Sequence, residues 1–125
     1  MSGASSYDVT HDGGLTPNGS PVSSGQAAAC WLAVVGRYAF TTNAASGSIG
    51  TFAIADDGTL SDVATTLIAS NAHPLDEAGV RDGHFLYVLA DGLHRIIGYK
   101  VGHDGGLTEV ASASVPAGVI GVGAH

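Results

Sequence analysis

Apolar and polar residues alternate along most of this chain of 125 residues, in short runs separated by glycine and aspartate. The segment "RYAFTT" alternates aromatic with small side chains, and "SIGTFAIA" places Phe52 and Ile54 on one face. A period of two is typical of β-strands with one buried face. The segment "HFLYVL" is apolar on both faces, which indicates a central strand covered on both sides. The pattern therefore predicts an all-β fold.

The strand pattern repeats along the chain. An offset of 47 residues pairs Gly36 with Gly83, and the pairing continues without a gap to Val63 and Val110. Four-stranded antiparallel units of roughly 40–50 residues in tandem are typical of propeller blades. A β-sandwich is the alternative, but sandwich strands need not repeat in sequence. We therefore predict β-propeller blades that form an incomplete ring of about two and a half blades.

One short phrase marks each repeat. "HDGGLT" occurs at residues 11–16 and 103–108, and the related "DDGTLS" occupies residues 56–61. An Asp-Gly dipeptide favours a hairpin turn because its glycine tolerates positive φ. Each copy is therefore predicted to be the hairpin between the third and fourth strands of a blade. The recurrence favours a structural role for this phrase over a role as a site.

The repeats divide one domain, residues 1–125, into four parts. We expect a half blade at residues 1–26, a blade at 27–73, a blade at 74–118 and a tail strand at 119–125. The first strand of the last blade is expected near Glu77–Arg81. The tail strand is expected to pair with the half blade of the same or of a neighbouring chain.

Charge and cysteine content restrict the partners. The formal net charge is -7, with only 4 Lys and Arg residues, and nucleic-acid binding needs clustered cations. We therefore expect no nucleic-acid partner. The longest apolar run is too short to cross a bilayer, so no membrane partner is expected. A single cysteine allows no intrachain disulfide, and no signal peptide is visible, which together favour the cytoplasm.

The segments "GRYAFTTNAASGSIGTFAIADDGTLSDV" and "DGHFLYVLADGLHRIIGYKVGHDGGLTEV" resemble blades of the lactonase-type seven-bladed β-propellers. This family includes 6-phosphogluconolactonase-like and carboxymuconate cyclase-like enzymes. The resemblance covers nearly the whole chain, and "VPAGVIGVGAH" resembles the C-terminus of such proteins. It implies that the chain corresponds to the last two to three blades of a ring of seven. It also implies a channel-facing acid, arginines and a histidine that bind and open or close a lactone.

The first strand of each blade lines the central channel of a propeller, which restricts the candidate residues. His73 and Glu77 are candidate catalytic residues, as an acid and a base. Asp76 and Glu77 are neighbours on a strand and point to opposite faces, so they do not form a carboxylate pair. A solvated strand entrance is the alternative interpretation. The candidate ligand-binding residues are Trp31, Asn43, Asp76, Arg81 and Asp91.

Metal and cofactor chemistry is not predicted. The six histidines are too widely spaced for a zinc site, and no EF-hand pattern of acidic residues is present. "GVIGVG" lacks the lysine and the following helix of a phosphate loop. Cys30 lies in an apolar run, where packing is the usual role of a cysteine. We therefore expect no metal and no cofactor.

An incomplete ring leaves apolar blade faces open, and such faces favour association. We therefore expect a homo-oligomer, most simply a dimer. Two functions follow: a self-assembling binding or scaffold module without catalytic residues of its own, or a lactone hydrolase or cycloisomerase whose site forms across subunits. The expected ligand is a sugar lactone or a carboxylate, and Trp31 is also suited to a sugar or a peptide. A fragment without its own function is the remaining interpretation.

Overall fold

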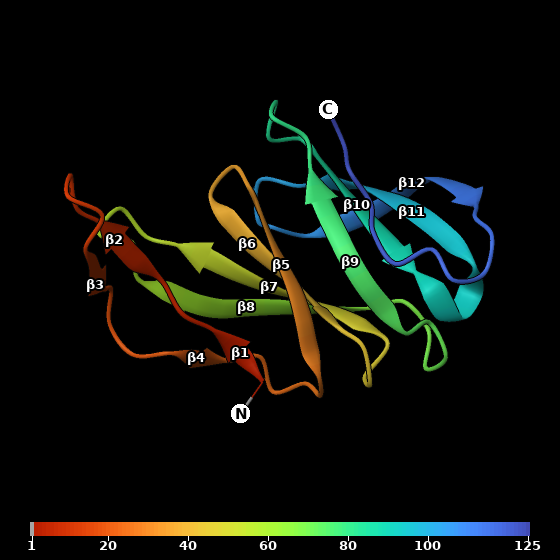
Figure 1. Cartoon of the computed structure of the whole chain (residues 1–125), viewed down its shortest axis with the longest axis horizontal. Helices are drawn as coiled ribbons and strands as arrows, with labels where there is room; N and C mark the ends of the chain where they lie inside the picture. Colours follow the sequence, from red (N-terminus) through yellow and green to blue (C-terminus); the bar gives the residue numbers. More distant parts are fainter. Residues whose placement is uncertain (1) are drawn as a thin grey trace.

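Antiparallel strands make up nearly all the regular structure of the chain, in a computed structural model that describes residues 2–125. Figure 1 shows two large sheets side by side, preceded by shorter ribbons. Within the described residues the only helical turn is η1, Asp91–Leu93. No helix in this part of the chain has the length and apolarity that a membrane crossing requires. The all-β fold with four-stranded antiparallel repeats is therefore confirmed.

The two large sheets each contain four strands in chain order, β5 to β8 and β9 to β12. Their central strands are the segments with the clearest alternation. Phe40 of β6 lies opposite Thr51 of β7, and Val88 of β10 lies opposite Ile97 of β11. The strands are β5 (Ala29–Val35), β6 (Tyr38–Asn43), β7 (Ser48–Ile54), β8 (Leu60–Leu67), β9 (Pro74–Gly79), β10 (Phe85–Ala90), β11 (Arg95–Val101) and β12 (Leu107–Ser114).

Strand β9 begins earlier than its sequence indicates. The prediction started this strand at Glu77, whereas β9 starts at Pro74 and pairs with β10 between Leu86 and Ala90. Proline is tolerated at the first residue of a strand, because its missing N–H costs at most one hydrogen bond at the end of the strand pairing. The segment "PLDEAG" has no alternating apolar pattern and no β-branched residue, so its strand character comes from pairing with β10.

The N-terminal segment forms an interrupted two-stranded ribbon. β1 (Gly3–Ala4) pairs with β4 (Val22–Ser23), and β2 (Tyr7–Val9) pairs with β3 (Leu15–Pro17). A shift of 45 residues places β1 and β2 on β7, and β3 and β4 on β8. The ribbon therefore corresponds to the third and fourth strands of a blade. Within residues 2–125 no first or second strand accompanies it.

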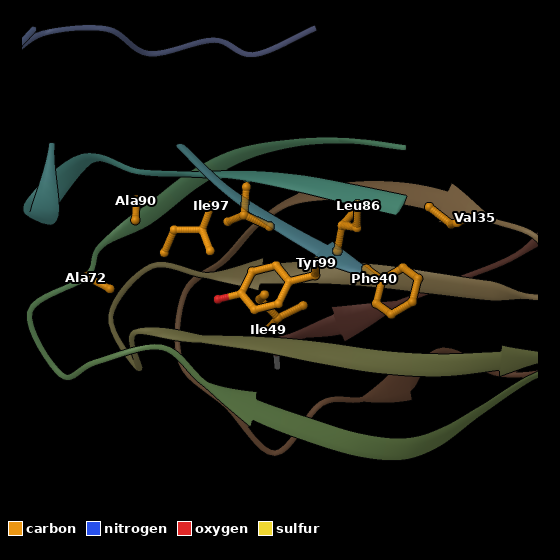
Figure 2. Packing of buried hydrophobic residues seen from close by; sticks show 9 residues of the cluster. Val35, Phe40, Ile49, Ala72, Leu86, Ala90, Ile97 and Tyr99 are labelled. Carbon is orange, nitrogen blue, oxygen red and sulfur yellow. The ribbon is translucent and has the colours of Figure 1, made fainter. Parts of the chain in front are cut away.

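The main apolar core lies between the two large sheets. Phe40 and Ile49 of the first sheet meet Leu86 and Ile97 of the second, and all four are buried (Figure 2). Burial of each such side chain stabilises the fold by about 1.5–3 kcal/mol. This core therefore joins two blades that share no backbone ladder. A smaller core joins the first sheet to the ribbon and contains Ala4, Val22, Ala39 and Phe52.

The Asp-Gly phrases form the predicted hairpin turns. Gly13, Gly58 and Gly105 have φ values of 84°, 79° and 79°, which favour glycine. In each turn the aspartate side chain accepts the backbone N–H of the residue two positions later, at 2.9–3.3 Å. The three turns lie between β2 and β3, β7 and β8, and β11 and β12. The hairpin interpretation of this phrase is therefore confirmed.

The prediction of a tail strand at residues 119–125 is wrong. Residues 115–125 belong to no strand, because Gly118, Gly121 and Gly123 weaken strand formation. This tail instead runs back along the sheet of β9 to β12, on the side away from β5 to β8 (Figure 1). It therefore covers part of the outer face of the last blade, where a further blade would otherwise lie.

Candidate functional site

Strand β9 carries two adjacent acidic residues that point to opposite sides. Asp76 faces the tail, and its Oδ2 accepts the N–H of Val122 at 2.7 Å. Its Oδ1 accepts the N–H of Glu77 at 2.8 Å. Glu77 faces β5 and β6 instead, near Ala33 and Thr42. The two carboxyl groups therefore share no site, as the alternation of side chains along a strand predicts.

Glu77 is buried between the two blades, with 3% of its surface exposed. Neither of its carboxyl oxygens has a hydrogen-bond partner of good geometry among the described residues. Burial raises the pKa of Glu77 to about 8. The nearby amide of Ala33 lowers this pKa in part, the charge of Asp76 raises it further, and the amide of Thr42 lowers it. Glu77 is therefore mostly protonated at neutral pH and carries a proton that it can donate.

His73 and Asp91 come together at the entrance to β9, although they are far apart in sequence. His73 Nδ1 lies 4.0 Å from Asp91 Oδ2, and the imidazole is half-exposed. The backbone of His73 has a φ of 43°, in the left-handed region that costs energy for a residue other than glycine. The N–H of Gly92 donates to the carbonyl of Ala72 at 3.0 Å and holds the two loops together. A carboxylate beside a histidine can orient the ring and balance the charge that the ring gains when it takes up a proton in general-base catalysis.

Trp31 and Asn43 lie on the blade that precedes β9, in different environments. Trp31 of β5 is exposed and accessible to a ligand. Asn43 ends β6 and is fully buried, and its Nδ2 donates to Ser48 Oγ at 3.2 Å. The Asn43 amide therefore orders the hairpin between β6 and β7, and a ligand cannot reach it in this arrangement.

Arg81 lies apart from the other candidate residues. It sits in the exposed turn between β9 and β10, at the opposite end of β9 from His73. No hydrogen bond or ion pair joins Arg81 to another described residue. The structure therefore brings together His73 and Asp91 among the candidate residues, and leaves Arg81 away from them.

A cleft of about 730 Å³ between the two large sheets was not expected from the sequence. Its lining includes Arg37, His84 and His103 from the turns at one end of the sheets, and Lys100 near the end of β11. The Arg37 guanidinium is already paired with the exposed Asp56 at 2.6 Å, so a nearby negative charge offsets its positive charge. The repeat contained a signal for this cleft, since Arg37 and His84 occupy equivalent positions at the start of second strands.

No three His, Cys, Asp or Glu side chains within residues 2–125 lie close enough to hold a metal ion. Cys30 is exposed on β5, in contrast to the packing role expected for it. The exposed surface of β5 also includes Leu32 and Val34, which are 42% and 56% exposed. One side of β5, the first strand of its blade, is therefore an uncovered apolar surface.

Tandem four-stranded blades with packed faces define the class of this molecule: a partial β-propeller. The model of the family described as lactonase, 7-bladed beta-propeller matches residues 1–119. The chain belongs to this family. No curated protein matches the chain in sequence.

Solved structures share this fold at low sequence identity. A protein from Lactobacillus plantarum has a TM-score of 0.75 and 16% identity, over 94% of this chain and 38% of that one. The periplasmic gluconolactonase of Pseudomonas aeruginosa has a TM-score of 0.71 and 17% identity, over 89% and 33%. A functionally unknown protein from Desulfotomaculum acetoxidans has a TM-score of 0.72 and 22% identity, over 85% and 33%. The chain therefore spans about a third of the length of these neighbours.

Proposed function

We propose that this chain is a self-assembling propeller segment, which binds a small molecule in a channel that several blades form together. The supporting observation is the open side of β5, where Leu32 and Val34 are exposed beside the channel. Water contact with two apolar side chains on a channel strand is unfavourable, and a covering blade removes it. The proposed occupant of this side is a second copy of the chain.

The packing of blades within the chain supplies a template for this assembly. The sheet of β9 to β12 lies against the sheet of β5 to β8, and the backbone of β9 at Gly79 approaches Val34 and Val35 of β5 so closely that a side chain there would collide with them. The same arrangement between copies places the last blade of one chain on the open side of β5 of the next. A head-to-tail contact repeated by rotation closes a ring. A dimer joined at both ends is the smallest closed form.

The mass in solution tests this proposal. We expect a dimer or a larger oligomer at micromolar concentration in size-exclusion chromatography with light scattering. Val34→Lys introduces a charge on the open side of β5 and is expected to give monomers with an unchanged far-UV circular dichroism spectrum. Val63→Lys is the matched control, because Val63 is exposed on the outer strand β8. A wild-type monomer at every concentration contradicts the proposal.

Lactone hydrolysis is the second candidate function, and the pairing of His73 with Asp91 favours it. The His73 ring would take a proton from water as the water oxygen attacks the lactone carbonyl. The ring C–O bond then breaks, and the leaving oxygen receives the proton. Asp91 would orient the His73 ring and balance its charge. A sugar lactone is the substrate class, in line with the gluconolactonase among the structural neighbours.

A pH-stat assay with gluconolactone tests this second function. Hydrolysis above the spontaneous rate is expected to fall about a hundredfold or more in His73→Ala. Asp91→Asn is expected to reduce the rate constant with little change in KM, since Asp91 acts through His73. His94→Ala is the control, because His94 is exposed in the neighbouring loop. Equal rates in the wild type and in His73→Ala exclude this role of His73.

A further inference from the structure

The outer face of the last blade is apolar and resembles the face that packs against the first large sheet. Phe85, Tyr87 and Leu89 of β10 alternate with the residues that enter the main core, so they point away from it. Ile96 and Asp76 lie opposite Leu89 on the neighbouring strands and share this face. Leu89 is fully buried although it is not part of the main core. A covering segment must therefore lie above it.

The covering segment is the tail, residues 116–125, and it is held weakly. One hydrogen bond joins this segment to the rest of the described chain, from the N–H of Val122 to Asp76 Oδ2 at 2.7 Å. The tail forms no ladder with β9, and Ile120 is 75% exposed. The tail therefore depends on a single polar contact and on partial apolar cover.

The tail also fills its place poorly. A cavity of about 420 Å³ remains between Val122–His125 and the side chains of Val80, Phe85, Tyr87 and Ile96. The opposite face of the same sheet is closed by a full blade, and its residues Leu86 and Val88 are fully buried. Protein interiors are packed without such gaps, so a blade surface fits the outer face better than the tail does.

We propose that residues 116–125 form a displaceable strap, and that its release exposes the outer face of the last blade to a second copy of the chain. This inference rests on the proposed self-assembly. The incoming surface is the open side of β5 of the second copy, with Leu32 and Val34. The contact of Val122 with Asp76 is the latch, and the strap competes with the second copy for one face. Two copies of the intact chain therefore associate less tightly than two copies would without the strap.

Val122→Pro tests the strap, because proline lacks the N–H that the latch needs. Loss of this hydrogen bond to a charged group weakens the strap, so the strap competes less with the second copy. The dissociation constant of the oligomer is therefore expected to fall about tenfold. Sedimentation equilibrium measures this constant in the full chain. Ile120→Pro is the matched control, since no hydrogen bond of the Ile120 N–H is present in the described chain. A peptide of residues 116–125 added to Val122→Pro is expected to restore the weaker association.

The outcomes separate the two proposals. Tighter association of Val122→Pro, with Ile120→Pro like the wild type, supports the strap. Equal association of the wild type and both variants overturns the strap and leaves self-assembly standing. Monomers for every variant, with unchanged circular dichroism, overturn self-assembly and the strap together. Hydrogen exchange at the amides of residues 119–125 checks that the latch is broken. It is expected to be faster in Val122→Pro than in the wild type and in Ile120→Pro, whichever association is measured.

Discussion

Strands β5 and β9 are equivalent inner strands of neighbouring blades. The apolar strand β5 leaves large side chains exposed, whereas the more polar strand β9 buries its acidic side chains. β5 has the apolar sequence "ACWLAVV" and leaves Leu32 and Val34 exposed. β9 has the sequence "PLDEAG" and buries Asp76 and Glu77. Hydrophobicity alone predicts the opposite result. The difference lies in the surroundings of the two strands.

Among the described residues 2–125, a packed neighbour covers β9 on each side, whereas β5 keeps the side of Leu32 and Val34 open. The first large sheet covers one side of β9, and the tail covers the other. The β1 to β4 ribbon packs on the central strands β6 and β7 through Ala39 and Phe52, and it leaves Leu32 and Val34 of β5 exposed. Burial of an inner strand is therefore determined by the blades that flank it. An apolar strand with one free side favours association, and an acid enclosed on both sides makes stability depend on pH.

The largest expected effect follows from the buried acid of β9. The pKa of Glu77 is about 8 in the folded chain and near 4.5 when the chain is unfolded. The folded state therefore holds a proton that the unfolded state loses, and stability falls as pH rises from 4.5 through 8. This loss has an upper limit of about 5 kcal/mol. Glu77→Gln keeps the shape without the ionisation, and is expected to remove the pH dependence and to raise stability at pH 8.

Urea denaturation at pH 5 and pH 8 measures this effect. Glu109→Gln is the control, because Glu109 is the only other glutamate and lies exposed on β12. It is expected to keep the wild-type difference between the two pH values. An equal difference in wild type and Glu77→Gln shows that Glu77 does not retain its proton in the folded chain.

Two adjacent valines of β5 give the intermediate effect. Val35 is 1% exposed and packs in the core between the sheets, whereas Val34 points to the open side. Val35→Ala is expected to lower the free energy of unfolding by about 1.5–3 kcal/mol. Val34→Ala is expected to change it by less than about 0.5 kcal/mol in the monomer. Thermal unfolding at a concentration where the chain is monomeric measures both, and equal losses contradict the assignment of the two faces.

The smallest effect concerns an exposed ion pair between two turns of the first large sheet. Arg37 pairs with Asp56 in the first large sheet, and the equivalent positions of the second are His84 and His103. Both partners of the ion pair are exposed, so Arg37→Ala is expected to cost at most about 0.5 kcal/mol. Unfolding in low and high salt measures the contribution. A loss above about 1 kcal/mol shows that this pair stabilises the first large sheet more than an exposed ion pair ordinarily does.

The repeat made the blades predictable, because strand period, turn glycines and register all recur at the same offset. Strands β6, β7, β10 and β11 follow directly from this pattern. The sequence pattern starts β9 too late and predicts a strand for the tail, because both segments depend on tertiary contacts that a local pattern does not contain. His73 and Asp91 were identified separately as candidates. They come close because two loops pack together at Gly92. Any larger residue there would place its Cβ against the carbonyl oxygen of Asn71.

The Asp-Gly hairpins have a consequence for behaviour in acid. Contacts within the turns lower the pKa of Asp12, chiefly through the Thr10 hydroxyl, and that of Asp57, chiefly through the Thr59 hydroxyl. Both aspartates are fully exposed at the periphery and remain ionised at a lower pH than free aspartates. The hairpins therefore keep negative charge on the rim as the other carboxylates are neutralised. In these two hairpins the turn motif thus also contributes electrostatic repulsion between protein molecules in mildly acidic solution.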